Sequence, residues 1–125
     1  MTDLPADPGA LVQSLADAWG AADLDTIMAH FTDDCVYENV GMGSMSGADE
    51  IRAGIEGFLA MGSFHFDTLR QVVDGDLVMN ERIDTITLAG GDGEIALRLM
   101  GVFEVRDGRI AAWRDYFDSA PFTGG

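Results

Sequence analysis

Apolar residues in the first half of the chain recur at the spacing of helices. A first amphipathic helix ends at Gly20, and its apolar positions follow the i, i+3, i+4, i+7 pattern: Val12, Leu15, Ala16 and Trp19. Asp23 is placed to cap a second, short helix, and Ser46 with Asp49 has the form of a capping box in front of a third. The apolar stripes of these two helices are Leu24, Ile27, Met28 and Phe31, and Ile51, Ile55, Phe58 and Leu59.

The remaining pattern is that of strands. Residues Cys35–Val40 alternate like a short strand, and the methionine-rich stretch Gly41–Met45 that follows is predicted to be a flexible loop. In the second half, stretches with strand character are separated by turn-forming Asp and Gly residues. They predict four long strands: Phe64–Val73, Leu77–Ala89, Glu94–Arg106 and Arg109–Phe117.

Helices followed by a meander of long strands indicate an α+β fold. We expect residues 1–125 to form one domain, since this length buries a core without cross-links. A strongly curved sheet with the N-terminal helices on one face leaves a deep pocket, which is typical of proteins that act on small molecules.

Composition and charge narrow the function. The single cysteine, Cys35, excludes an intramolecular disulfide, and the first residues lack the basic and apolar regions of a signal peptide. No apolar run is long enough to span a membrane, so we expect a cytoplasmic protein with no membrane partner. A net charge of −15 argues against nucleic acid as a partner and against anionic substrates. A neutral, apolar substrate fits this charge better.

Ionisable residues interrupt strand faces that are otherwise apolar. Because side chains on a strand alternate, Arg82 and Asp84 share a face with Ile86 and Leu88. Asp115 shares a face with Trp113 and Phe117, and the strand between them presents Leu97, Leu99, Gly101 and Phe103. An ionised group that faces a core is costly unless it is paired or used in chemistry.

The turn at Asp107-Gly108 sets how these faces align. A two-residue loop places Asp115 opposite Met100, on the other face of the sheet. A three-residue loop with Gly108 in the left-handed conformation pairs Val105 with Arg109 and places Asp115 opposite Leu99. We predict the second register, because it brings the apolar faces together.

In that register Arg82 lies between Asp84 and Asp115. An arginine can bridge two carboxylates, and two carboxylates in a dry pocket seldom stay equally ionised. One then serves as a general acid and the other as a general base. Tyr37 and Asn39, two residues apart on the short strand, could hold a water molecule beside them. A purely structural ion pair between arginine and aspartate is the alternative interpretation.

Other candidate residues are weaker. His30 and His65 lack partners at the spacing of metal ligands, and Cys35 lies in a strand beside apolar residues, where it suits packing.

Four fragments, taken in order, resemble the limonene-1,2-epoxide hydrolases of the nuclear-transport-factor-2-like superfamily. These fragments are Tyr37-Glu38-Asn39, Glu81-Arg82-Ile83-Asp84, Gly101-Val102-Phe103 followed by Asp107-Gly108, and Trp113-Arg114-Asp115-Tyr116-Phe117-Asp118. The similarity extends from about Leu11 to Phe117. It implies the superfamily fold, a cone-shaped, strongly curved mixed sheet closed by helices.

The resemblance also implies roles. Asp115 is expected to be the base that takes a proton from water, and Tyr37 and Asn39 to hold that water. Asp84 is expected to protonate the epoxide oxygen, with Arg82 as the bridge. The expected pocket walls are Trp19, Ile86, Leu97, Leu99 and Phe117. In this family water attacks without a covalent ester, metal or cofactor, and the members commonly form homodimers through the sheet.

The sequence departs from the family mainly at Gly41–Met45, where two glycines replace a proline-rich stretch. The resemblance therefore does not determine the size or specificity of the substrate. Other functions share the fold. Polyketide cyclases, ketosteroid isomerases and non-enzymatic binding or dimerisation modules therefore remain alternatives. A binding module has no need of two carboxylates joined by an arginine, and an isomerase needs one base and an oxyanion hole.

Overall fold

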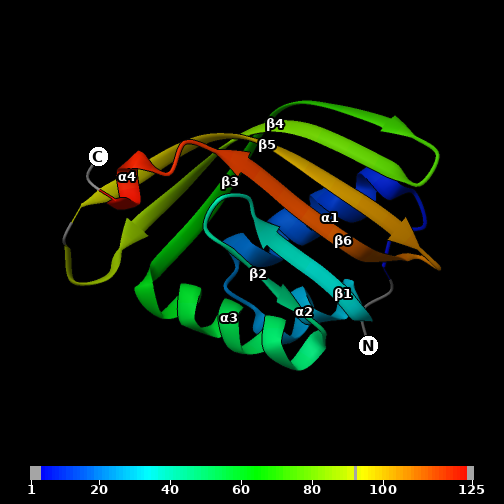
Figure 1. The fold of residues 1–125 in the computed structure, drawn as a ribbon, viewed down its shortest axis with the longest axis horizontal. Helices are drawn as coiled ribbons and strands as arrows, with labels where there is room; N and C mark the ends of the chain where they lie inside the picture. The colour runs from blue at the N-terminus through cyan, green and yellow to red at the C-terminus, as the bar shows by residue number, and fades with distance from the viewer. Residues whose placement is uncertain (1–3, 92, 124–125) are drawn as a thin grey trace.

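The chain forms one six-stranded sheet with helices packed against it, and the computed structural model describes residues 4–91 and 93–123 (Figure 1). The elements of the first half are α1 (Pro8–Gly20), α2 (Leu24–Ala29), β1 (Phe31–Asn39), β2 (Gly43–Ser46) and α3 (Ala48–Met61). Those of the second half are β3 (Gly62–Asp74), β4 (Leu77–Leu88), the short 3₁₀ turn η1 (Ala89–Gly91), β5 (Glu94–Arg106), β6 (Arg109–Phe117) and α4 (Ala120–Thr123).

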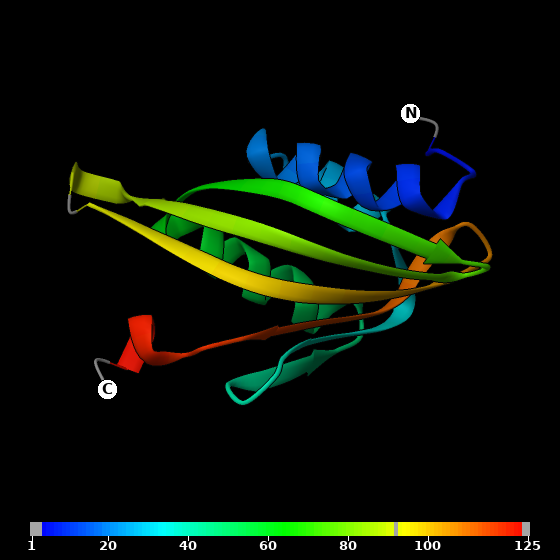
Figure 2. The same ribbon diagram turned by 90° about the horizontal axis from the view of Figure 1, so that it is seen from above.

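The sheet is mixed, in the order β2-β1-β6-β5-β4-β3. Strand β1 runs parallel to β6, and every other neighbouring pair is antiparallel. Figure 1 shows the curved sheet arching over α3, and Figure 2 shows α1 along the β3 edge with β1 and β2 at the opposite edge. The predicted α+β fold with a strongly curved mixed sheet is confirmed.

The core lies between the concave face of the sheet and the first three helices. Helix α1 contributes Leu11, Leu15 and Trp19, which are almost fully buried, and α3 contributes Ile51 and Ile55. The amphipathic stripe predicted for α1 therefore faces the sheet. Burial of side chains of this size stabilises the fold by roughly 1.5–3 kcal/mol each.

The predicted boundary between the second helix and the first strand is wrong. Helix α2 ends at Ala29, and His30 closes its last turn by donating from Nδ1 to the carbonyl oxygen of Thr26 (2.7 Å). Phe31 therefore belongs to β1, where it pairs with Ile110 of β6. Apolar spacing cannot separate the last position of a helix stripe from the first buried position of a strand.

The loop and the capping box predicted before α3 are also wrong. Gly41 and Gly43 adopt positive φ angles of 88° and 145°, so the chain reverses and β2 pairs with β1. The N-cap of α3 is Gly47, and no side chain caps it. The backbone N–H of Ser46 donates to the Glu50 carboxylate instead (3.2 Å).

The predicted register of the last hairpin is wrong, although the predicted face of Asp115 holds. Asp107 and Gly108 form a two-residue turn with φ angles of 53° and 78°. A bulge then leaves Ala111 without a partner, because Val105 pairs with Ile110 and Glu104 with Ala112. The two-residue turn alone would place Asp115 opposite Met100, and the extra residue moves it one position further, opposite Gly101. Gly101 is on the same face as the predicted partner Leu99, so Asp115 stays on the concave side.

The outer face of the sheet carries several exposed apolar side chains, among them Val72, Met79, Met100 and Tyr116. Homodimerisation through the sheet stays a prediction. Among the helices of the described residues, none has the length and apolar character needed to cross a membrane.

The junction between α3 and β3 depends on a glycine. Gly62 follows the helix directly, and a Cβ atom there would lie 2.1 Å from the carbonyl oxygen of Thr87 on β4. We expect Gly62→Ala to lower the free energy of unfolding by about 1–3 kcal/mol, since the opposing atoms are backbone. Gly57 lies on the exposed side of α3 with open space around it, so Gly57→Ala should raise stability by about 0.5–1 kcal/mol. Thermal denaturation measures both, and equal stability of the two variants would contradict this packing.

Candidate active site

The centre of the site is the buried guanidinium of Arg82, which is 1% exposed. Its Nε and Nη2 donate to the two carboxylate oxygens of Asp84 at 3.0 and 2.8 Å. Nη2 also donates to Oδ2 of Asp115 at 3.0 Å. One arginine thus bridges two carboxylates whose residues are only 5% and 3% exposed.

Gly101 makes room for this bridge. It lies on β5 between Asn80 of β4 and Asp115 of β6, so no side chain fills the gap between those two residues. A Cβ atom at Gly101 would lie 2.3 Å from Nη1 of Arg82 and 3.0 Å from Oδ1 of Asp115. The bulge at Ala111 is what places Asp115 beside this glycine.

Aromatic rings surround the guanidinium. Its Cζ atom lies 4.9 Å from the ring centroid of Phe66, 5.7 Å from that of Phe103 and 5.9 Å from that of Trp113. The indole N–H of Trp113 donates to Oδ1 of Asp115 at 2.8 Å, so both oxygens of this carboxylate accept hydrogen bonds. These rings shield the guanidinium from water, and their faces favour its positive charge.

Tyr37 and Asn39 lie beside Asp115 because β1 runs parallel to β6. Asn39 pairs in register with Asp115, and Tyr37 with Trp113. The ring of Tyr37 stacks on Trp113 at a centroid distance of 4.1 Å. The two candidate water ligands therefore come from the neighbouring strand and line the same cavity as the carboxylates.

Burial shifts the proton affinities of the cluster. It raises the pKa of Asp84 to about 6, although Arg82 opposes the shift, and it also raises the pKa of Asp115 against the charge of Arg82. Burial, with a contribution from the charge of Asp115, raises the pKa of Tyr37 well above its usual range. Burial acts to lower the pKa of Arg82, but the two carboxylates outweigh it, so that pKa is raised and the arginine stays charged.

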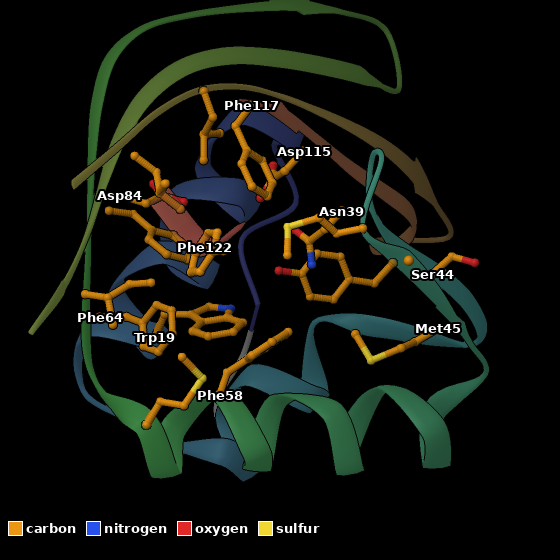
Figure 3. A pocket seen from close by; sticks show the side chains of 18 residues that line it. Trp19, Asn39, Ser44, Met45, Phe58, Phe64, Asp84, Asp115, Phe117 and Phe122 are labelled. Atoms are coloured by element: carbon orange, nitrogen blue, oxygen red, sulfur yellow. The ribbon is translucent and has the colours of Figure 1, made fainter. Parts of the chain in front are cut away.

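A cavity of about 410 Å³ opens onto the two carboxylates. Figure 3 shows Asp84 and Asp115 on its upper side and Trp19, Phe58 and Phe64 below them. All five residues predicted as pocket walls line it: Trp19, Ile86, Leu97, Leu99 and Phe117. Residues that the sequence did not single out as walls also line it: Met42, Gly43, Ser44, Met45, Phe58, Met61, Phe64, Phe66 and Phe122.

The other candidate residues lie outside this cavity. His30 is buried, with its Nε2 at 2.9 Å from the hydroxyl of Ser14. Burial raises the pKa of the Cys35 thiol to about 12, which keeps it protonated and unreactive. In the part of the chain that the structure describes, no group of three or more His, Cys, Asp or Glu side chains is arranged to hold a metal ion.

Two contacts of the cluster were not predicted from the sequence. Asn80 accepts a hydrogen bond from Nη1 of Arg82 at 3.0 Å, and Trp113 holds Asp115 through its indole nitrogen. The alternation that united Arg82 with Asp84 also includes Asn80, two residues earlier on the same face. The spacing of Trp113 and Asp115 gives the same signal on β6.

Comparison with known proteins identifies the family. Residues 6–123 match the limonene-1,2-epoxide hydrolase catalytic domain. The chain is 36% identical over 107 residues to epoxide hydrolase EphG of Mycobacterium tuberculosis (strain ATCC 25618 / H37Rv), which covers 86% of this chain and 70% of that protein.

Solved structures support the family and the fold. The structure of an M. tuberculosis LEH-like epoxide hydrolase is similar with a TM-score of 0.80 and 36% identity, over 90% of this chain and 84% of that one. A putative polyketide cyclase from Xanthomonas campestris pv. campestris is similar with a TM-score of 0.82 and 18% identity, over 94% of each chain. At 18% identity the second likeness shows the fold alone. The match of nearly the whole chain shows that this protein belongs to the limonene-1,2-epoxide hydrolase family and is an epoxide hydrolase.

Proposed function

We propose that the protein adds water to a neutral, apolar epoxide in one step and forms a vicinal diol without a covalent intermediate. The observation that carries this proposal is the position of the ion cluster. Two buried carboxylates, bridged by Arg82, face a cavity that is otherwise lined mainly by apolar side chains. Tyr37 and Asn39 supply hydrogen-bonding groups on the adjacent strand.

Charge balance supports separate roles for the two carboxylates. Arg82 carries one positive charge, so a site with both aspartates ionised has a net charge of −1 in a dry environment. Retention of one proton makes the cluster neutral. Both aspartates accept hydrogen bonds on both oxygens, and burial raises the pKa of both, so these features do not separate their roles. Position does: Asp115 pairs in register with Asn39, close to Tyr37 on the same strand, so it lies beside the candidate water ligands. We therefore assign the base to Asp115 and the acid to Asp84.

In the proposed reaction the cluster gives up one proton and takes up another. Asp115 takes one proton from a water molecule held with Tyr37 and Asn39, and the water oxygen forms a bond to one epoxide carbon. The carbon–oxygen bond of the ring breaks as the ring oxygen takes the proton of Asp84. The product is a diol, with Asp115 protonated and Asp84 ionised. Transfer of one proton from Asp115 to Asp84 restores the starting state.

The cavity supports a substrate of moderate size and low polarity. Its volume of about 410 Å³ is within the range of roughly 300–1,000 Å³ for small-molecule sites. Its polar groups include the two carboxylates, Tyr37 and Asn39, whereas Trp19, Phe58 and Phe64 form an aromatic wall. A cyclic or terpene-like epoxide places its single oxygen at the carboxylates and its hydrocarbon part against this wall. The acidic surface of the protein suits a neutral substrate.

Substitution of either carboxylate tests the roles. Asp115→Asn removes the base and Asp84→Asn removes the ionisable acid, while both keep the shape of the side chain. We expect each to lower kcat for diol formation by about 100-fold or more. Asp67→Asn, on the exposed side of β3, is the matched control and should keep wild-type turnover. Turnover is measured on an epoxide found in a panel screen, and circular dichroism checks the fold. Wild-type kcat in Asp115→Asn would contradict the assignment.

The dependence of kcat/KM on pH gives a second test. The pair must hold one proton, so activity is lost as pH falls and Asp115 is protonated, and lost as pH rises and the proton of Asp84 leaves. Because burial raises the pKa of Asp84 to about 6, the alkaline limb begins well above the titration of an ordinary carboxyl. We expect a bell-shaped profile from initial rates in buffers of constant ionic strength. A rate that stays constant from mildly acidic to strongly alkaline pH would show that no protonated carboxyl takes part.

A further inference from the structure

Arg82 has a third partner behind the two carboxylates. Its Nη1 donates to Oδ1 of Asn80 at 3.0 Å, and Asn80 is 1% exposed. Asn80 is not among the described residues that line the cavity, so any effect on the reaction passes through Arg82. With this contact, four of the five N–H donors of the guanidinium have acceptors.

A chain of amides fixes the orientation of Asn80. Its Nδ2 donates to Oε1 of Gln71 on β3 at 3.2 Å, and Nε2 of Gln71 donates to the carbonyl oxygen of Gly9 in α1 at 3.3 Å. A flipped Asn80 amide would set its NH₂ group against the guanidinium and its oxygen against the oxygen of Gln71. The carbonyl at the end of the chain can only accept, so it determines both amide orientations.

We propose that Asn80 is a positioning residue: its carbonyl holds the Nη1 side of the guanidinium and thereby fixes the plane in which Nη2 reaches both Asp84 and Asp115. A planar guanidinium bound at Asp84 alone can still tilt about that carboxylate. The contact at Nη1 is the second fixed point, and the bridge to Asp115 requires it. The role in catalysis rests on the function proposed above.

The absence of charge on Asn80 matters for the proton affinity of the two carboxylates, just as its shape matters for the position of Arg82. The ionisable groups that act on the cluster are Asp84 on β4, Asp115 on β6, Tyr37 on β1 and, at longer range, His65 on β3. An aspartate at position 80 would place a third carboxylate on the same guanidinium. Like charges disfavour ionisation, so the pair would bind its proton more tightly. An asparagine accepts the hydrogen bond from Nη1 without raising the proton affinity of the pair.

Two substitutions separate position from charge. Asn80→Ala removes the acceptor, and we expect kcat to fall about 10- to 100-fold from misplacement of the bridge, with KM changed less than about threefold. Asn80→Asp keeps an oxygen at Nη1, and we expect the titration of the two carboxyls to move upward by about one pH unit. The carboxyl titration is followed by NMR on protein with ¹³C-labelled aspartate, which requires no substrate, and the pH profile of kcat/KM should move in the same direction.

Val78→Ala is the matched control, because Val78 lies two residues before Asn80 on the same strand and is fully buried in the apolar core. It should lower the melting temperature but leave the carboxyl titration and the pH profile unchanged. The inference is overturned if Asn80→Ala, shown to be folded, keeps wild-type kcat, or if Asn80→Asp leaves the carboxyl titration in place. If the wild-type protein opens no epoxide while the titration still moves, the proposed function fails and the coupling of Asn80 to the carboxylates stands.

Discussion

Burial of the Arg82 charge is the constraint on which the rest of the structure depends. An ion taken out of water costs several kcal/mol unless its charge and its hydrogen-bonding groups are satisfied. Asp84, Asp115 and Asn80 satisfy them from two strands, and Gly101 supplies the space on the strand between. The curved sheet and the aromatic residues around it keep this cluster dry. Such an arrangement is a weak source of stability, because an apolar core of the same size is at least as stable.

The same dry surroundings suit the cluster to the proposed acid and base chemistry. Exposed aspartates are ionised at neutral pH and make poor acids. Here burial raises the pKa of both Asp84 and Asp115, and the single charge of Arg82 offsets one of the two negative charges. In the proposed mechanism one proton is thereby kept beside a carboxylate that can accept another. The cavity would bring an apolar substrate next to the water held by Asp115, Tyr37 and Asn39, so the few polar groups there decide the reaction.

Much of this arrangement can be predicted from the sequence. The features that cannot be predicted each have a local structural cause. Alternation on β4 united Arg82 with Asp84, and the apolar face of β6 placed Asp115 on the same side. The exact pairing depends on the bulge at Ala111, since one unpaired alanine leaves no mark in a pattern of apolar and polar residues. Strand β2 was missed because two glycines read as a flexible loop, although their positive φ angles form its turn. The amide chain from Asn80 joins β4, β3 and α1, so only the folded structure reveals it.

The central claim is that Asp115 activates water and does not itself attack the epoxide. An attacking carboxylate forms an ester, and hydrolysis of that ester leaves one carboxylate oxygen in the first diol. A single turnover in heavy-oxygen water, with enzyme in excess over substrate, separates the two routes by mass spectrometry of the diol. We predict that the first diol carries the heavy oxygen. An unlabelled first diol, followed by labelled diol in later turnovers, would contradict the account and identify an aspartate as the nucleophile.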